Sequence, residues 1–231
     1  MPAAPAPDAA IFAGHFSLEA TRPTAAEIAA LADIIPPATP IYFSAVPTIT
    51  PQEIVAAAAS LRKAGLEPII HVAARRLASA AALQELLSGL RGEADVRRLL
   101  VIGGDVDAPG AFSDALAIVQ KGRLREAGIE EIGIGAYPEG HPRIPAGRLE
   151  SALDEKIAAA TAQGLRIHIV SQFSFSPERV LAWLRRIRVG GIGQHALRLV
   201  YRGQVGRLAG EQGVEVELGK LELGGREGHD I

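Results

Sequence analysis

The chain has 231 residues, of which 48% are hydrophobic and 22% are charged, and this composition is typical of a folded globular protein. The formal net charge is -2 and Lys and Arg are scattered, so binding to a phosphate backbone is not expected. The chain contains no cysteine, which excludes disulfides, thiolate metal sites and a cysteine nucleophile. No segment has the roughly 18 consecutive apolar residues of a membrane span, so we expect a soluble cytoplasmic protein without membrane contacts.

The amino-terminal segment is rich in Pro and Ala but has no basic stretch before an apolar one, so it is not interpreted as a secretion signal. We expect residues 1–14 to be a disordered lead. Residues 15–231 are expected to form a single domain, because no linker composition divides them.

Short apolar segments alternate with longer Ala- and Leu-rich segments of helical period from residue 15 onward. This alternation is typical of repeated βα units on a parallel sheet. The apolar segments are almost continuous, as expected for strands that are covered on both faces. They predict six strands, at His15–Ala20, Pro40–Val46, Glu67–Ala73, Arg98–Asp105, Glu131–Tyr137 and Arg166–Gln172.

Capping residues indicate where the helices begin and end. Thr24, followed three positions later by Glu27, matches a capping box, in which two side chains satisfy free backbone N–H groups. Thr50 and Pro51 suit the cap and first turn of the next helix, and Gly65 suits its end. Later helices are expected to begin near Ser79, near Gly147 and near Ser176 or Pro177.

The alternation weakens after Arg188, where Ala196–Arg202 could form a seventh strand and Val214–Leu223 is a polar, alternating stretch. We predict an α/β fold of the TIM-type (βα)8 barrel class, incomplete or divergent at its carboxyl-terminal end. A doubly wound sheet has the same alternation and remains the alternative on pattern alone. If the barrel is incomplete, a homo-oligomer could cover the exposed sheet edge.

Ligands of parallel βα proteins bind at the carboxyl ends of the strands, so polar residues there are candidates for a functional site. Glu19 ends the first predicted strand and could act as a general acid. Alternatively, it pairs with Arg22 or caps the next helix. Asp105 ends the fourth strand and could be a functional carboxylate, or a turn residue that follows two glycines.

Histidines and one tyrosine add to these candidates. His71 lies late in the third strand, where a histidine either contacts a ligand or belongs to the core with its hydrogen bonds satisfied. The fifth predicted strand ends at Tyr137 and runs into a loop with Glu139 and His141, and the loop position of His141 favours a binding role. The histidines show no HxxxH or HxH spacing, so a metal site is not expected.

Two further residues could contact a ligand. Gln172 precedes Phe173 at the end of the sixth strand and could present its amide to a heterocycle beside an aromatic wall, or simply pack in the core. Lys156 falls inside a predicted helix rather than at a strand end, which argues against a Schiff-base lysine.

Four motifs in chain order, FSLEATRP, LLVIGGD, GIGAYPEGHP and VSQFSF, resemble those of the methylenetetrahydrofolate reductase family. The resemblance covers roughly residues 16–188, and its most specific part is YPEGHP followed by SQFSF. It implies a barrel enzyme that reduces 5,10-methylenetetrahydrofolate to 5-methyltetrahydrofolate. The hydride would come from NADH or NADPH, usually relayed through FAD.

The resemblance also implies roles for individual residues. Glu19 would protonate N10 of the folate and open its five-membered ring, and Asp105 would stabilise the resulting cation. Gln172, Phe173 and Asp105 would bind the pterin. The positions that contact the flavin in the family correspond to His71, Gly104, Asp105, Tyr137, His141 and Lys156.

Two departures from the family pattern leave alternatives open. Gly103 stands where the family has an arginine that would contact the flavin, so direct transfer of hydride from NADH is an alternative to a bound FAD. The family's late-barrel pattern is not recognisable after Arg188. The competing hypotheses are another barrel enzyme, of lyase or aldolase type, with Glu19 and His71 as acid and base, and a folate- or flavin-binding protein without turnover.

Overall fold

The computed structural model describes residues 16–44, 46, 48–104, 106, 110–172 and 176–187, together with 196–198, 203–204, 215–218 and 220–221. Three predictions fall outside these residues, namely the lead at 1–14 and the placements of Asp105 and Phe173.

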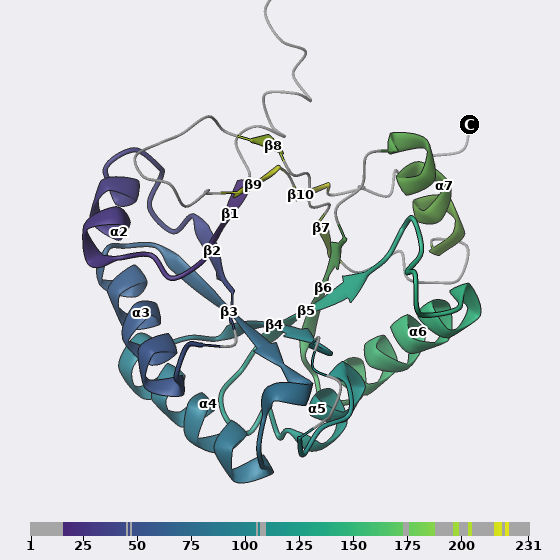
Figure 1. The fold of residues 1–231 in the computed structure, drawn as a ribbon, viewed down its shortest axis with the longest axis horizontal. Helices are drawn as coiled ribbons and strands as arrows, with labels where there is room; N and C mark the ends of the chain where they lie inside the picture. The colour runs from purple at the N-terminus through teal and green to yellow at the C-terminus, as the bar shows by residue number, and fades with distance from the viewer. Residues whose placement is uncertain are drawn as a thin grey trace, which may run out of the picture.

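Strands and helices alternate along the described chain (Figure 1). The strands are β1 (Phe16–Ala20), β2 (Pro40–Phe43), β3 (Glu67–Ala73), β4 (Arg98–Ile102), β5 (Glu131–Ala136), β6 (Arg166–Ser171), β7 (Ala196–Arg198), β8 (Gly203–Gln204), β9 (Glu215–Leu218) and β10 (Lys220–Leu221). The α-helices are α2 (Ala25–Ala32), α3 (Pro51–Lys63), α4 (Ala80–Ala94), α5 (Ala115–Lys121), α6 (Ala146–Ala162) and α7 (Pro177–Ile187), and a 3₁₀ turn spans Ala74–Arg76.

Strands β1 to β7 lie side by side in chain order and every neighbouring pair is parallel. The sheet curls, and the helices lie on its outer side (Figure 1). This arrangement is the predicted TIM-type barrel rather than a doubly wound sheet, because no strand crosses over to reverse the order.

The closure of the barrel departs from the eight-stranded parallel pattern. β9 pairs antiparallel with β1, and β10 pairs antiparallel with β7, so one short carboxyl-terminal segment runs along both edges of the parallel sheet. The parallel barrel is therefore incomplete, as predicted. Its edges are paired within the chain, so a second protomer is not needed to cover them. The homo-oligomer remains a prediction.

The predicted helix caps are confirmed. Thr24 accepts a hydrogen bond from the backbone N–H of Glu27, and the Glu27 carboxylate accepts one from the N–H of Thr24 at 2.7 Å. Thr50 and Glu53 repeat this arrangement at the start of α3, where Pro51 occupies the first turn. These reciprocal bonds satisfy backbone groups that a helix start leaves free.

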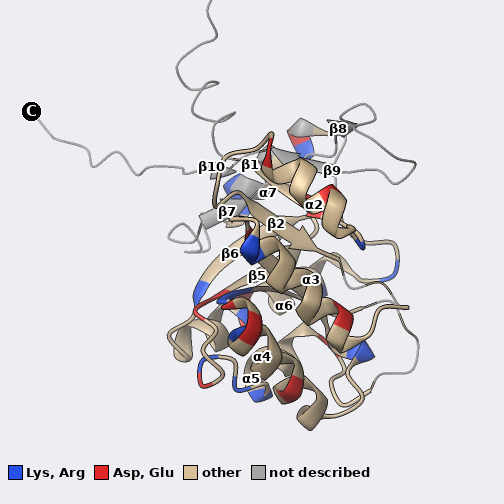
Figure 2. Cartoon of the chain, turned by 90° about the vertical axis from the view of Figure 1, so that its left-hand side faces the viewer, with Lys and Arg blue, Asp and Glu red and all other residues tan. Residues whose placement is uncertain are grey.

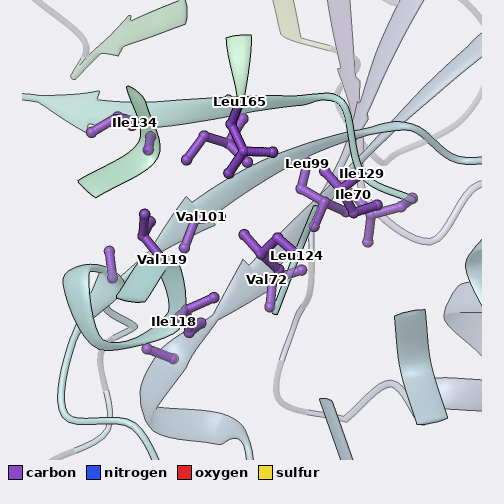
Figure 3. Close-up of a cluster of buried hydrophobic side chains, with 14 of the residues drawn as sticks. Ile70, Val72, Leu99, Val101, Ile118, Val119, Leu124, Ile129, Ile134 and Leu165 are labelled. Carbon is purple, nitrogen blue, oxygen red and sulfur yellow. The ribbon is translucent and has the colours of Figure 1, made fainter. Parts of the chain in front are cut away.

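The main hydrophobic core lies between the sheet and the helices. Ile70 and Val72 of β3 and Leu99 and Val101 of β4 belong to this core together with Ile118 and Val119 of α5 (Figure 3). Alternate residues of the same strands point the other way, because side chains alternate across a strand. Inside the curled sheet they form a smaller cluster, composed of Tyr42, Ile69, Leu100 and Val170 with Ile102 packed against it.

In the view of Figure 2, positions of Lys and Arg and positions of Asp and Glu are interspersed along the described elements. The described residues include no helix with the length and apolar character needed to cross a membrane.

Several predicted strands extend one to three residues too far, as at β2, β4, β5 and β6, whereas β3 has the predicted bounds. Tyr137 and Gln172 therefore lie just beyond the last residues of β5 and β6.

Candidate active site

Glu19 lies at the carboxyl end of β1, where it faces the barrel interior. Leu18 and Ala20, its neighbours in the strand, pack outward against α2 and α3, so the alternation of the strand turns Glu19 inward. Its carboxylate accepts a short hydrogen bond from the hydroxyl of Ser44, which directly follows β2. Ser44 carries no motif of its own, and its pairing with Glu19 was not predicted.

The two structural roles considered for Glu19 belong to other residues. Arg22 donates a hydrogen bond to the Thr48 hydroxyl at 3.0 Å, and its guanidinium lies 3.6 Å from the Glu53 carboxylate. The cap of α2 is Thr24. Glu19 is thus a partly buried carboxylate near a strand end that accepts a hydrogen bond from the Ser44 hydroxyl and is positioned to meet a ligand.

His71 is buried inside the barrel on β3, and its ring meets the edge of Tyr42 with 5.8 Å between ring centroids. Burial lowers the pKa of His71 to about 4, so the imidazole is neutral at physiological pH. Its Nε2 atom has no hydrogen-bond partner among the described residues. A buried polar atom of this kind is costly unless a ligand satisfies it, which favours the ligand-contact interpretation over the satisfied core histidine.

The turn after β4 carries the Gly-Gly pair. Gly104 has a φ of +88°, in the left-handed region that favours glycine, and a Cβ at this position would lie 3.4 Å from the Cβ of Ala73. Arg75 lies beside this turn: its backbone N–H donates to the Gly103 carbonyl at 3.0 Å and its Nε donates to the Ser113 carbonyl at 2.9 Å. The glycines therefore bring the chain from β4 close against the end of β3.

The loop after β5 brings Tyr137 and His141 together. Their rings meet edge to face with 5.2 Å between centroids, and the His141 Nδ1 accepts a hydrogen bond from the N–H of Arg143 at 3.2 Å. Burial raises the pKa of Tyr137. In the same loop, the Glu139 carboxylate accepts a hydrogen bond from the N–H of Ser176 at 3.2 Å and so connects the loop to the start of α7.

Lys156 belongs to α6, as the sequence indicated, yet its ammonium group reaches the sheet. Nζ lies 3.4 Å from the carbonyl oxygen of Gly135, close to the end of β5. Burial lowers the pKa of Lys156 to about 8, against the opposing effect of the Asp114 carboxylate. A lysine on a helix is thus brought within two residues of Tyr137 along β5.

Gln172 directly follows β6 and its side chain is exposed. Its backbone N–H donates to the Ala136 carbonyl at 2.6 Å, which fixes the end of β6 against the end of β5. The structure therefore places six of the predicted residues, Glu19, His71, Gly104, Tyr137, Lys156 and Gln172, on or beside the carboxyl halves of five strands. Because these strands are parallel neighbours, their carboxyl ends lie at one end of the barrel.

A polar network that was not predicted crosses the barrel interior beneath these residues. The Tyr42 hydroxyl lies 2.8 Å from the Nε2 of His168, and the His168 Nδ1 lies 2.8 Å from the Glu131 carboxylate. Arg98 donates to the same carboxylate at 2.9 Å. Burial raises the pKa of Glu131, but the contact with His168 and the charge of Arg98 outweigh this and lower it to about 2. The alternation of β6 turns His168 inward, but its partners lie on distant segments.

Two inward-facing glycines of β5 shape this interior. A Cβ on Gly133 would lie 2.6 Å from the His168 Nε2 and 2.9 Å from a methyl group of Leu100, so glycine is required there. A Cβ on Gly135 would meet no atom of the described residues within 4 Å, so these residues leave the space in front of it open. Gly135 is paired with Val170, so the open space lies beside the interior apolar cluster to which Val170 belongs. An open space next to apolar side chains suits a flat heterocyclic ligand.

No family model matches the chain. Among solved structures it is similar to a putative phosphonomutase from Burkholderia cenocepacia J2315, with 12% identity and a TM-score of 0.57 over 87% of this chain and 85% of that one. It is also similar to 3-dehydroquinate dehydratase from Geobacillus kaustophilus HTA426, with 15% identity and a TM-score of 0.46 over 79% of this chain and 68% of that one. At such identities the first match supports the fold alone. The chain therefore has the α/β architecture of TIM-barrel enzymes, and its reaction has to be argued from the site.

Proposed function

We propose that this protein reduces 5,10-methylenetetrahydrofolate to 5-methyltetrahydrofolate with hydride from NADH or NADPH. The observation that carries the proposal is the place of Glu19, a partly buried carboxylate at the end of β1 whose contact is the Ser44 hydroxyl. The FSLEATRP motif that contains it resembles the reductase family. The YPEGHP and SQFSF motifs of the same resemblance follow β5 and β6 of the same sheet.

The reaction needs an acid, because the leaving group is the tertiary amine N10 of the folate. Glu19 in its protonated form would donate a proton to N10, and the bond between N10 and the bridging carbon would break to give a cation at N5. Hydride from NADH then forms the new C–H bond, so that one NADH and one proton are consumed per methyl group formed. Ser44 would orient the Glu19 carboxyl group toward its proton acceptor.

The cation needs a nearby anion, and the resemblance assigns this role to Asp105. Gln172 would present its amide to the pterin beside Phe173, since an amide matches the donor and acceptor pattern of that ring. The exposure of Gln172 at the end of β6 supports this role, because the side chain is accessible to a ligand.

Several described residues fit a flat redox heterocycle. His71 has a buried Nε2 without a described partner, Gly135 leaves open space, and Lys156 places an ammonium group beside the end of β5. His141 and Tyr137 would border the same region, and Gly104 allows close approach of the backbone. A bound flavin or a nicotinamide would supply the hydride chemistry. Because Gly103 stands where the family has an arginine that would contact the flavin, direct hydride transfer from NADH stays an alternative to transfer through FAD.

The test is an assay of purified protein without added flavin, in which NADH loss and 5-methyltetrahydrofolate formation are followed together with the visible spectrum. Equal loss of NADH and gain of product would support the proposal. A yellow protein would indicate FAD and a colourless one direct transfer. Glu19→Gln should abolish turnover and change the Kd for folate by only a few fold, because it removes the proton and keeps the shape. If the wild-type protein shows no turnover without FAD and none with FAD supplied, the reductase proposal is refuted and a binding protein remains.

A second candidate is a lyase or isomerase acting on a small oxyacid, with Glu19 and His71 as acid and base. The buried His71 Nε2 favours it, because this atom has no partner among the described residues and is available to a ligand. The similar Burkholderia structure is named a putative phosphonomutase, and such an activity falls in this broad class of reactions. Turnover of a phosphonate or 2-oxoacid that disappears in His71→Asn, without consumption of NADH, would support this candidate over the reductase.

A further inference from the structure

The contact between Tyr42 and His168 joins two strands that are not neighbours. Tyr42 belongs to β2 and His168 to β6, and β3, β4 and β5 lie between them in the sheet. Because the sheet curls, a bond between these strands crosses the interior of the barrel (Figure 1). The two residues are 126 positions apart in the sequence. Both are almost completely buried, at 0% and 1% exposure.

Other residues hold this contact in place from both sides. The His168 Nδ1 lies 2.8 Å from the Glu131 carboxylate, and Arg98 donates to that carboxylate at 2.9 Å. Gly133 leaves the volume that the imidazole occupies. At the β2 end of the contact, the Tyr42 ring packs against the His71 ring in a T-shaped arrangement. The imidazole therefore has contacts at both nitrogens and little room to move.

The joined strands carry opposite parts of the candidate site. Tyr42 is paired with Glu19 in the β1–β2 register, and Ser44, which directly follows β2, donates to Glu19. His168 of β6 lies four residues before Gln172, which directly follows that strand. The separation of β2 and β6 thus determines how far Glu19 lies from Gln172 across the barrel mouth.

We propose that Tyr42 and His168 are positioning residues, whose hydrogen bond across the barrel sets the separation between the Glu19 side and the Gln172 side of the site. The need for such a link follows from the incomplete parallel barrel. A complete ring of eight strands fixes its own diameter through its register, whereas here short antiparallel segments replace the last parallel strand. The effect on turnover rests on the proposed function, but the geometric claim does not.

The experiment measures the mouth of the barrel directly. Since the chain has no cysteine, Gln52→Cys and Arg179→Cys introduce two unique spin-label positions on exposed residues of the first turns of α3 and α7. Double electron–electron resonance then gives the distance distribution between the labels. We expect Tyr42→Phe to broaden or shift this distribution, because it removes the hydroxyl and keeps the ring. Tyr137→Phe is the matched control, since it removes a phenol hydroxyl that is not part of the link.

A second variant covers the case in which the lone substitution prevents folding. Tyr42→Phe with His168→Leu leaves no orphaned imidazole, and Glu131 keeps Arg98 and also Arg166, whose Nη1 lies 3.3 Å away. A distance distribution unchanged from the wild type in both variants would overturn the proposal, whether or not the protein is a reductase. If the reductase activity is present, kcat/KM should fall by up to roughly 10²-fold, mainly through KM. A fall in Tm with kcat/KM unchanged would indicate a purely structural role.

Discussion

The imidazole of His168 occupies the volume that a side chain at position 133 would need, because a Cβ on Gly133 would lie 2.6 Å from its Nε2. The two residues are direct neighbours across the β5–β6 register. A buried histidine inside a narrow barrel is thus possible only because the facing strand carries glycine at this level.

The first prediction follows from this close approach. Gly133→Ala should destabilise the protein by about 1–3 kcal/mol, since the new methyl group would approach His168 and Leu100, whose side chains are buried and packed. Urea unfolding followed by circular dichroism measures the change. Gly135→Ala is the matched control, because its methyl group would enter open space in the same strand. Equal midpoints for the wild type and Gly133→Ala would contradict the described packing.

The second prediction concerns the open space at Gly135. Gly135→Val should keep the free energy of unfolding close to that of the wild type, since no atom of the described residues lies within 4 Å of the new Cβ and valine favours strands. It should nevertheless raise the KM for the heterocyclic substrate roughly tenfold or more, because the branched side chain fills the space proposed for the ligand. Steady-state kinetics beside a urea titration separate the two effects, and unchanged KM would remove Gly135 from the binding site.

The third prediction concerns the pH dependence of stability. The folded-state pKa of His71, about 4, lies below the ordinary 6.5, so the unfolded chain binds the proton first as the pH falls. Stability is therefore complete above pH 6.5 and declines toward pH 4, by about 3 kcal/mol. His71→Met should lack this part of the decline, measured as the difference in unfolding free energy from the wild type between pH 7 and 4.5.

The measurement stops at pH 4.5 so that protonation of Glu131 does not contribute to the change in unfolding free energy. Its pKa of about 2 lies below the ordinary 4.5, so its contribution is present above pH 4.5 and is lost as the pH falls toward 2. His141→Met controls for replacing a histidine as such. A pH slope in His71→Met identical to that of the wild type would show that His71 is not the group that resists protonation.

The fourth prediction tests the carboxylate that the resemblance assigns to cation stabilisation. Asp105→Asn should lower kcat by roughly 10²-fold, because it replaces a charge with a neutral group of the same shape where positive charge develops. Single-turnover measurements report the chemical step without product release. A rate within a factor of about three of the wild type would exclude Asp105 from the mechanism.

Local elements of the fold were largely predictable. The bounds of β3 at Glu67–Ala73 match the prediction, and the capping boxes of Thr24 and Thr50 form as expected. The predicted strands β5 and β6 each extended one residue too far, to Tyr137 and Gln172, because composition does not mark the exact last residue of a strand. The start of helix α5 and its cap Asp114 were not predicted, since the helix has only 7 residues and little periodicity.

The sequence by itself determined the alternation of strands and helices, the end of the barrel at which Glu19, Tyr137 and Gln172 lie, and the absence of cysteine chemistry. These properties depend on local periodicity, capping and composition, which are properties of short segments. Only the tertiary structure decided that Ser44 contacts Glu19, that Lys156 reaches β5 from a helix, and that Tyr42 meets His168 across the barrel. Each of these contacts joins residues 21 to 126 positions apart, and their meeting depends on how the sheet curls, which no local pattern encodes.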